Sequence, residues 1–284
     1  MKVVITPNPY RDRNFRCAAE ARDILERAGI ETAVCLAFEV EKDFDLPKTV
    51  ELKDLNRELK TSDMLICFGG DGTLLHASKA ATYHKVPVLG VNIGTMGFMT
   101  ELESTEVAQL ADLARRDYRL EERMMLSVNV LREGAEVYRE NALNDAVVTK
   151  GAVARVIQMG IYCDGVEAMS FSGDGVIVCT PTGSTAYSMS AGGPIVEPSA
   201  ENIILTPVCA HTMQTRPIVT AGNRTIDIRI GRIGRKNAFL SADGGRAFRL
   251  NTGDTIRIRR SNHVTRLVKL DNRSFFDILN KKLK

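Results

Sequence analysis

The chain has 284 residues, of which 44% are hydrophobic and 26% are charged, and its formal net charge is +3. This length fits one large domain or two of ordinary size, with a core that needs no disulfide or metal support. The slight positive charge does not argue for nucleic-acid binding, and the sequence has no basic block interleaved with aromatic residues. No apolar run approaches the length of a membrane span, and the N-terminus has too few apolar residues for a signal peptide.

The six cysteines bear on the cellular compartment. None of them forms a close pair with the spacing of a metal site. Cys35, Cys67, Cys179 and Cys209 lie within apolar runs and are predicted to be small buried side chains. Because buried free thiols are typical of a reducing compartment, we expect a cytoplasmic protein.

Strand-like and helix-like segments alternate along the first part of the chain. The predicted elements are strand 3–5, helix 14–28, strand 32–38, strand 64–68, helix 74–83, strand 86–91 and helix 104–116. Ser104 is the predicted N-cap of the last helix. Such alternation is typical of an α/β domain with a Rossmann-like parallel sheet, here over residues 1–120. Ligands of such sheets bind beyond the carboxyl ends of the strands, where two glycine-rich loops lie, at 69–72 and 94–97.

The pattern changes near residue 120, where strand-like segments begin to dominate. They are predicted at 126–131, 135–139, 146–149, 156–162, 176–179, 203–208, 225–230 and 255–259. Turn residues separate them, which predicts a mainly β, sandwich-like domain over residues 121–270. Residues 271–284 are predicted to form a helical tail, with packing against the N-terminal domain as one arrangement open to it.

The turn Gly69-Gly70-Asp71-Gly72-Thr73 lies between a predicted strand and a predicted helix. In such a turn, backbone N–H groups can approach phosphate oxygens. The Asp71 carboxylate would repel a bare phosphate, so it suggests a magnesium ion or a hydroxyl whose proton must leave. A tight turn in which the glycines serve only backbone geometry is the alternative. The turn is neither a Walker A loop nor a Gly-x-Gly-x-x-Gly fingerprint.

A second, longer motif runs from Gly173 to Pro194. An apolar strand leads into Thr180-Pro181-Thr182-Gly183-Ser184-Thr185-Ala186-Tyr187 and then into a helix of small residues. The hydroxyls and backbone amides of this turn can bind sugar hydroxyls or phosphates, and the Tyr187 ring can stack on a base. A capped helix start, with Thr182 or Ser184 as the N-cap, is the alternative.

Together these motifs resemble the bacterial NAD kinase family. The resemblance rests on GGDGT at 69–73, ALND at 142–145 and GDGVIVCTPTGSTAYSMSAGGPIV at 173–196, and it covers almost the whole chain. GGDG alone is shared with diacylglycerol, sphingosine and phosphofructokinases, whereas the long motif is highly specific. The resemblance implies transfer of the γ-phosphoryl group of ATP, with Mg²⁺ or another divalent metal, to the adenosine ribose 2′-hydroxyl of NAD, which gives NADP. It also implies a phosphofructokinase- or diacylglycerol-kinase-like N-terminal domain.

The resemblance assigns roles to individual residues. Asp71 would accept the proton of the 2′-hydroxyl, and no protein ligand is assigned to the metal. The residues that would bind the nucleotide phosphates are Gly69, Gly70, Gly72, Thr73 and His76. His76 follows Thr73 by one helical turn, and an exposed helix histidine is the alternative for it. The positions that match NAD-contacting residues of the family are Asn144, Asp145, Asp174, Thr182, Thr185, Ala186, Tyr187 and Ser190.

Three positions depart from the family pattern. Asp145 stands where the family has Glu, so its carboxylate is one methylene shorter in reach. Ser172 stands where some members have an arginine, which removes a direct cationic contact with the dinucleotide. Asp243-Gly244-Gly245 predicts a hairpin turn, and the family often has Asp-Gly-Gln here, near the substrate pocket.

Two other functions share part of this pattern. A lipid or sphingoid kinase would use GGDGT but would leave the run 180–194 unexplained. A non-catalytic dinucleotide-binding regulator would bind NAD without turnover and would have little use for Asp71. For the NAD kinase interpretation, the resemblance implies a homodimer or homotetramer. We expect no nucleic-acid or membrane partner.

Overall fold

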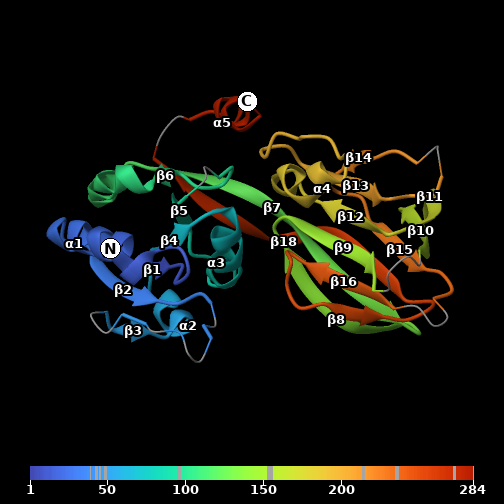
Figure 1. The fold of residues 1–284 in the computed structure, drawn as a ribbon, viewed down its shortest axis with the longest axis horizontal. Helices are drawn as coiled ribbons and strands as arrows, with labels where there is room; N and C mark the ends of the chain where they lie inside the picture. The colour runs from blue at the N-terminus through green and yellow to red at the C-terminus, as the bar shows by residue number, and fades with distance from the viewer. Residues whose placement is uncertain are drawn as a thin grey trace. The chain divides into compact units, whose positions relative to one another are not determined.

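The computed structural model describes residues 1–38, 40–41, 44, 46–47, 50–94, 97–151, 156–212, 215–233, 237–270 and 273–283. Thr95 and Met96 of the predicted second glycine-rich loop lie outside these residues, as does Lys284 at the end of the predicted tail. The chain forms two compact units, Met1–Glu122 with Thr265–Lys284, and Arg123–Val264. Figure 1 shows the helices and strands of both units.

The first unit is built on a parallel sheet. Its strands lie in the order β3 (Leu52–Lys53), β2 (Glu31–Cys35), β1 (Lys2–Pro7), β4 (Met64–Gly69) and β5 (Val88–Asn92). The short strand β6 (Leu102–Glu103) and the end of β18 (Thr255–Lys269) also pair with β5, again in parallel. Every residue of β4 and β5 is buried, which explains why both strands are continuous apolar runs in the sequence.

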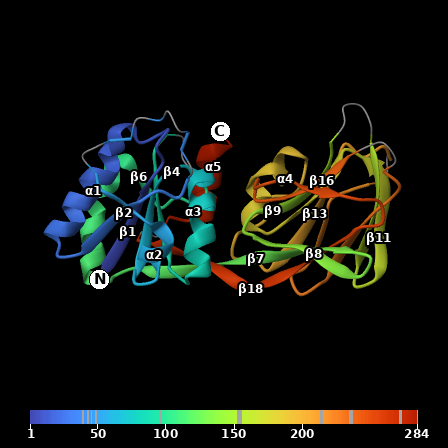
Figure 2. The same ribbon diagram turned by 90° about the horizontal axis from the view of Figure 1, so that it is seen from below.

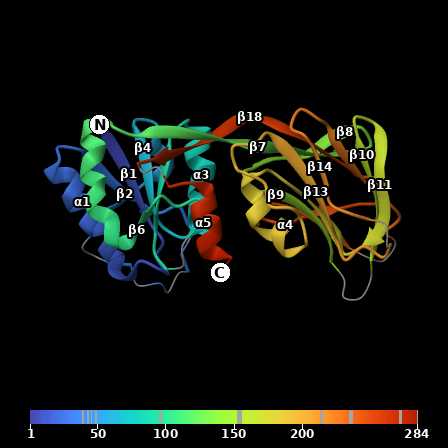
Figure 3. The same ribbon diagram turned by 90° about the horizontal axis from the view of Figure 1, so that it is seen from above.

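The helices of the first unit are η1 (Arg13–Phe15), α1 (Arg16–Arg27), α2 (Leu55–Leu59), α3 (Asp71–Tyr83), η2 (Ser104–Arg115) and α5 (Phe275–Lys282). Apolar residues of α1 and η2 share one core with alternate residues of β1, β4 and β5. The helix α3 contacts β4 and β5, and Figures 2 and 3 show it on the opposite side of the sheet from α1. Among the described residues, no helix is long and apolar enough to span a membrane.

Local hydrogen bonding moves two predicted helix starts. The N-cap of η2 is Glu103, not Ser104 as predicted, because Glu103 and Glu106 form a reciprocal capping box. The helix α1 begins at Arg16, two residues later than predicted. The preceding Asn14 and Phe15 both have positive φ angles, and the Asp12 carboxylate accepts the N–H groups of the first turn of α1.

The prediction for the cysteines is wrong at one position. Cys35, Cys67 and Cys179 are buried, but Cys209 is exposed. The strand β13 ends at Val208, and Cys209 follows it with a positive φ of 47°, where the chain leaves the sheet.

The second unit is β-rich. Its elements are β7 (Arg119–Arg132, which begins in the first unit), β8 (Ala135–Ala142), β9 (Asp145–Lys150), β10 (Ile157–Cys163), β11 (Val166–Gly173), β12 (Gly175–Cys179), η3 (Thr182–Thr185), α4 (Tyr187–Ser190), β13 (Asn202–Val208), β14 (Ile218–Ala221), β15 (Ile226–Ile230), β16 (Ala238–Ala242), β17 (Phe248–Leu250) and most of β18. One antiparallel sheet has the order β14-β13-β12-β9-β16-β17. The strands β11, β10, β15, β18, β7 and β8 pair in the other sheet.

Both sheets of the second unit contribute to one core. Val128 of β7 and Ile228 of β15 share it with Val148 of β9 and Val178 of β12. The neighbouring residues of β12 point to the opposite face of their sheet, as the period of two residues requires. There Ile177 belongs to a smaller cluster that also includes residues near α4. The turn after β12 is therefore attached to a strand that is buried on both faces.

The buried pair Lys269–Glu101 in the first unit gives a test of stability. The Lys269 ammonium donates to the Glu101 carboxylate, which also accepts the N–H of Leu270 at 2.7 Å. We expect Lys269→Met to lower the free energy of unfolding by about 3 kcal/mol, because the buried carboxylate loses its ammonium partner. Urea denaturation measures this loss, and Lys269→Met/Glu101→Gln should recover much of it. An unchanged urea midpoint for Lys269→Met would contradict this interpretation.

Candidate active site

Asp71 is the first residue of α3, and it follows β4 after a single N-capping glycine, Gly70. The first N–H groups of a helix have no partner within the helix, and the helix dipole favours negative charge near them. The Asp71 carboxylate is held by a loop from beyond β5. Its Oδ2 accepts the N–H of Phe98 at 2.7 Å, and its Oδ1 accepts the N–H of Met99 at 3.0 Å. Each oxygen keeps a lone pair for a further partner.

Two glycines are required by close packing around this carboxylate. A Cβ at Gly97 would lie 2.1 Å from Oδ1 of Asp71, and a Cβ at Gly69 would lie 2.2 Å from Oγ1 of Thr73. The Thr73 hydroxyl also accepts a hydrogen bond from Asn8 at 2.8 Å, which ties the end of β1 to the start of α3.

The other two glycines of the turn have a different surrounding. A Cβ at Gly70 or at Gly72 would meet no atom within 4 Å. Neither glycine has a positive φ angle. Packing and backbone conformation therefore do not require glycine at these two positions, whose lack of side chains leaves space in front of the helix.

A pocket of about 420 Å³ opens at this point. It is lined by Asn8, Arg11, Phe38, Gly70, Asp71, Gly72, Thr73, Gly97 and Lys282. Three of the predicted phosphate-site residues, Gly70, Gly72 and Thr73, are thus brought together with the predicted proton acceptor Asp71. The cations Arg11 and Lys282 and the ring of Phe38, which no motif indicated, line the same pocket.

Two predicted phosphate-site residues are not part of this lining. Gly69 is buried behind it, against the Thr73 side chain. His76 is exposed on α3, and its ring stacks on that of Phe38 with the centroids 4.6 Å apart.

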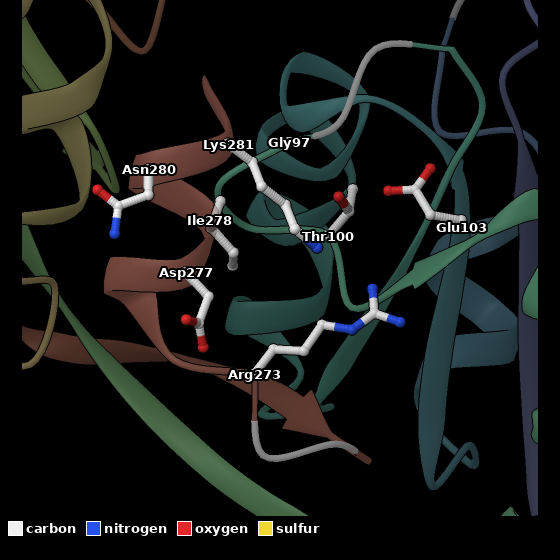
Figure 4. A pocket seen from close by; sticks show the side chains of 8 residues that line it. All are labelled: Gly97, Thr100, Glu103, Arg273, Asp277, Ile278, Asn280 and Lys281. Carbon is white, nitrogen blue, oxygen red and sulfur yellow. The ribbon is translucent and has the colours of Figure 1, made fainter. Parts of the chain in front are cut away.

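A second pocket of about 360 Å³ lies beside α5. Its lining consists of Gly97, Thr100, Glu103, Arg273, Asp277, Ile278, Asn280 and Lys281, and Figure 4 shows these residues. In that view the Arg273 guanidinium extends toward Glu103. Gly97 lines both pockets, so the loop that holds Asp71 contributes to each of them.

In the second unit, Asn144 and Asp145 lie where β9 begins. Their backbone is fixed by Asp243, which follows β16. The Asp243 carboxylate accepts the N–H groups of Leu143 at 2.7 Å, of Asn144 at 2.7 Å and of Asp145 at 3.1 Å. Asp243 has a φ of 50°, a left-handed conformation that aspartate adopts more readily than most residues. The predicted hairpin turn therefore also positions the Asn-Asp pair, which the sequence alone did not indicate.

The hydroxyl-rich turn packs directly against this pair. The N–H of Thr180 donates to the carbonyl of Asn144 at 2.9 Å, and the Thr180 hydroxyl accepts the N–H of Gly183 at 3.1 Å. A Cβ at Gly183 would lie 2.2 Å from the Asn144 carbonyl oxygen, so only glycine permits this approach. The side-chain oxygen of Asn144 is buried and has no hydrogen-bond partner among the described residues. Such an atom is available to a ligand.

The Asp145 carboxyl is strongly perturbed. It is only 6% exposed. Burial raises its pKa to about 7, and the charge of the neighbouring Asp243 adds to the increase. Asp145 thus places a short carboxyl, easily protonated near neutral pH, beside the Asp243 carboxylate, which accepts three backbone N–H groups.

The remaining predicted NAD contacts divide between two places. Thr182 and Thr185 lie in η3, and Ala186 follows them. Tyr187 and Ser190 are exposed on α4. A ring that is 47% exposed, as that of Tyr187 is, can stack on a planar group.

Asp174 lies apart from these residues, since it precedes β12 and the hydroxyl-rich turn follows it. The five residues of β12 separate the two places by roughly 17 Å. Asp174 forms an ion pair with Lys150 at 2.6 Å.

No three acidic, histidine or cysteine side chains within the described ranges are grouped to hold a metal ion. Of the described residues that line the pocket at the start of α3, only Asp71 carries a carboxylate. These residues therefore suit a cation that arrives with phosphate ligands of its own, because Mg²⁺ commonly binds through one or two carboxylates and substrate phosphates.

Comparisons with known proteins cover both units. The model of the ATP-NAD kinase N-terminal domain matches residues 3–118, and that of the ATP-NAD kinase C-terminal domain matches residues 143–270. The NAD kinase of Symbiobacterium thermophilum is 45% identical over 226 residues, which are 78% of each protein. The chain belongs to the NAD kinase family. The NAD kinase of Ruminiclostridium cellulolyticum is 36% identical over 287 aligned positions, covering 99% of this chain and 97% of that protein.

Solved structures share the fold. Yeast NADH kinase complexed with NADH has a TM-score of 0.85 and 25% identity, and the match covers 100% of this chain and 87% of that one. An NAD kinase from Archaeoglobus fulgidus in complex with ATP has a TM-score of 0.75 and 24% identity, with 100% and 98% covered. The predicted family, and the predicted pairing of an α/β N-terminal domain with a β-rich C-terminal domain, are confirmed.

The different surroundings of the glycines in the first motif can be tested. We expect Gly69→Ala to lower the free energy of unfolding by about 1–3 kcal/mol, because its Cβ overlaps the Thr73 side chain. Gly72→Ala should leave the stability unchanged or raise it by up to about 1 kcal/mol, because alanine suits a helix better. Urea denaturation of both variants measures the contrast, and equal losses would contradict the assignment.

The raised pKa of Asp145 predicts a pH-dependent stability. From about pH 4 to pH 7 the folded protein keeps a proton on Asp145 that the unfolded chain has released, so stability falls as the pH rises through this window. Asp145→Asn cannot ionise. Its stability relative to the wild type should therefore rise by at most about 4 kcal/mol between pH 4 and pH 8. Urea denaturation at several pH values measures this, and a constant difference would show that Asp145 is not perturbed.

Proposed function

We propose that this chain is an NAD kinase in which Asp71 accepts the proton of the adenosine ribose 2′-hydroxyl of NAD while the γ-phosphoryl group of ATP is transferred to that oxygen. Membership of the family makes the protein a phosphotransferase that acts on NAD. The observation that carries the assignment of Asp71 is its place at the start of a helix, in a pocket with two cations and open space at Gly70 and Gly72.

The first unit suits the phosphate donor. Helix N-terminal N–H groups bind phosphate oxygens, and Arg11 and Lys282 add positive charge to the same pocket. Mg²⁺ would enter with the triphosphate, where it neutralises charge on the phosphate oxygens. The scarcity of carboxylates among the described pocket residues supports this assignment, and we assign no dedicated protein ligand to the metal.

The Asp71 carboxylate suits the role of proton acceptor. Both of its oxygens are fixed by backbone N–H groups, and each keeps a lone pair that can accept the proton of a hydroxyl. Phosphoryl transfer proceeds through a loose transition state, so catalysis depends mostly on positioning and electrostatics. A rigidly held carboxylate meets both requirements, because it orients the attacking oxygen and receives its proton.

The second unit suits the dinucleotide. Asn144 offers a buried side-chain oxygen that has no hydrogen-bond partner in the described part of the chain. This oxygen can accept a hydrogen bond from a ribose hydroxyl or a base amino group. Thr182, Thr185 and Ala186 lie in the adjacent turn, and Tyr187 and Ser190 follow on α4. We assign these residues and Asp145 to NAD. The complex of yeast NADH kinase with NADH is consistent with a dinucleotide as the acceptor.

The finer fold assignments are also proposals. The parallel order β3-β2-β1-β4-β5 supports a Rossmann-like, phosphofructokinase-like N-terminal domain. The common core of the two sheets supports a sandwich-like second domain. We further propose a homodimer or homotetramer, on the family resemblance, and a cytoplasmic location, which the buried free thiols favour.

The two alternative functions are less well supported. None of the relatives named above is a lipid or sphingoid kinase, so the comparisons give that function no support. A non-catalytic regulator would not need a carboxylate fixed at a phosphate-type helix start.

An assay of NADP formation from NAD, ATP and Mg²⁺ tests the proposal, with sphingosine and diacylglycerol as alternative acceptors. We expect turnover when NAD is the acceptor and none when sphingosine or diacylglycerol takes its place. We also expect Asp71→Asn to lower kcat by about 10²–10⁴-fold, because the proton acceptor is lost. Thermal unfolding of this variant controls for the loss of one loop hydrogen bond. Turnover that survives undiminished in Asp71→Asn would rule out the assignment of Asp71.

A further inference from the structure

The C-terminal helix α5 contacts the same loop that holds Asp71. The N–H of Phe98 donates to the Asp71 carboxylate, and the Phe98 ring lies under the ammonium of Lys282, which is 4.3 Å from the ring centroid. The ring of Phe275, at the start of α5, is 6.2 Å from that of Phe98. One residue thus links the carboxylate of the pocket to both ends of α5.

Local contacts fix the start of α5 and bury one of its side chains. Ser274 and Asp277 form a capping box at its start, and Ile278 is buried. Its last turn carries Lys281 and Lys282, where the helix dipole favours positive charge. The helix therefore presents two ammonium groups at one end, next to the loop at 97–99.

The two lysines face different pockets. Lys282 lines the pocket that contains Asp71, Gly70 and Gly72. Lys281 lines the other pocket, with Thr100 and Glu103, and Figure 4 shows its side chain there. Lys281 and Lys282 thus lie next to each other on the same exposed turn, but of the two only Lys282 lines the pocket that contains Asp71.

The negative charge of a phosphate donor bound beside Asp71 would require more than one cation in the pocket. A nucleoside triphosphate or a polyphosphate brings several negative charges next to the Asp71 carboxylate. Arg11 lines the same pocket from the segment after β1, and a Cβ at Gly94 would lie 3.3 Å from its guanidinium. Lys282 is the second cation of the described lining, and it comes from the opposite end of the chain.

We propose that α5 is part of the phosphate-donor site, and that Lys282, held over the Phe98 ring, contacts the phosphates of the donor bound at Asp71. This proposal rests on the proposed function for the identity of the donor as ATP. The cation–π contact with Phe98 restricts the flexible Lys282 side chain to the lining of the pocket. The same residue that fixes the proton acceptor through its N–H then places a phosphate-binding cation through its ring.

The test compares Lys282→Met with the matched control Lys281→Met. Methionine keeps an unbranched apolar side chain but removes the charge. Equilibrium affinity for a non-hydrolysable ATP analogue with Mg²⁺, measured by calorimetry without NAD, should fall about tenfold in Lys282→Met, the loss expected for one charge-assisted hydrogen bond. Lys281→Met should stay within about twofold of the wild type, and Lys282→Arg should restore most of the affinity, since it keeps the charge.

Steady-state kinetics provide a second readout. In Lys282→Met the KM for ATP should rise with the loss of affinity, while the KM for NAD stays nearly constant. The affinity of the wild type should also depend more steeply on salt concentration than that of the variant, because one charge contact is missing.

A double-mutant cycle tests the role of the ring. Phe98→Leu keeps the backbone N–H and removes the aromatic face. The effects of Phe98→Leu and Lys282→Met on analogue affinity should be less than additive, because the ring acts through the ammonium. Full additivity would overturn the role of Phe98.

The outcomes separate this proposal from the proposed function. Equal affinities of Lys282→Met and Lys281→Met for the analogue, or no analogue binding by the wild type, would overturn the role of α5. Wild-type protein that binds the analogue with the predicted dependence on Lys282, yet forms no NADP, would refute the function and leave the role of α5 supported.

Discussion

The two hydrogen bonds from the backbone of Phe98 and Met99 to the Asp71 carboxylate are the constraint on which the first unit depends. They join the start of α3 to the loop after β5, and they leave so little room that position 97 must be glycine. A carboxylate held in this way cannot rotate freely toward solvent. Its free lone pairs therefore keep a fixed direction in the pocket, which a group that orients and deprotonates a hydroxyl requires.

The second unit uses the same physical device with a different carboxylate. Asp243 accepts three backbone N–H groups and so fixes the start of β9. The charge of the neighbouring Asp243 also contributes to the raised pKa of the buried Asp145, after the larger effect of burial. In both units a carboxylate–backbone contact orders the loop, and the side chains available to ligands lie next to it.

The sequence predicts the parts of this arrangement that are local. The buried strands β4 and β12 are continuous apolar runs, and the motifs that follow them are contiguous, so both candidate sites could be proposed from residue types alone. The contributions of Arg11, Phe38, Lys282 and Asp243 could not, because they reach their sites from distant segments. In the sequence, Asp243 indicates only a turn. Its contact with the backbone of Asp145 joins residues that are 98 positions apart, so only the folded structure shows it. Helix starts also escape prediction where a preceding side chain accepts the first N–H groups, as Asp12 does for α1, or where Glu103 takes the place of the predicted cap Ser104.

The role of Asp71 is tested most directly by a crystal structure of the protein with NAD and a non-hydrolysable ATP analogue. We predict that the adenosine ribose 2′-oxygen lies within about 2.6–3.2 Å of the Asp71 carboxylate, the distance that proton transfer requires. We also predict that the γ-phosphate of the analogue lies at the N-terminus of α3. A different hydroxyl group at Asp71, or phosphates bound away from Gly70 and Gly72, would contradict this role.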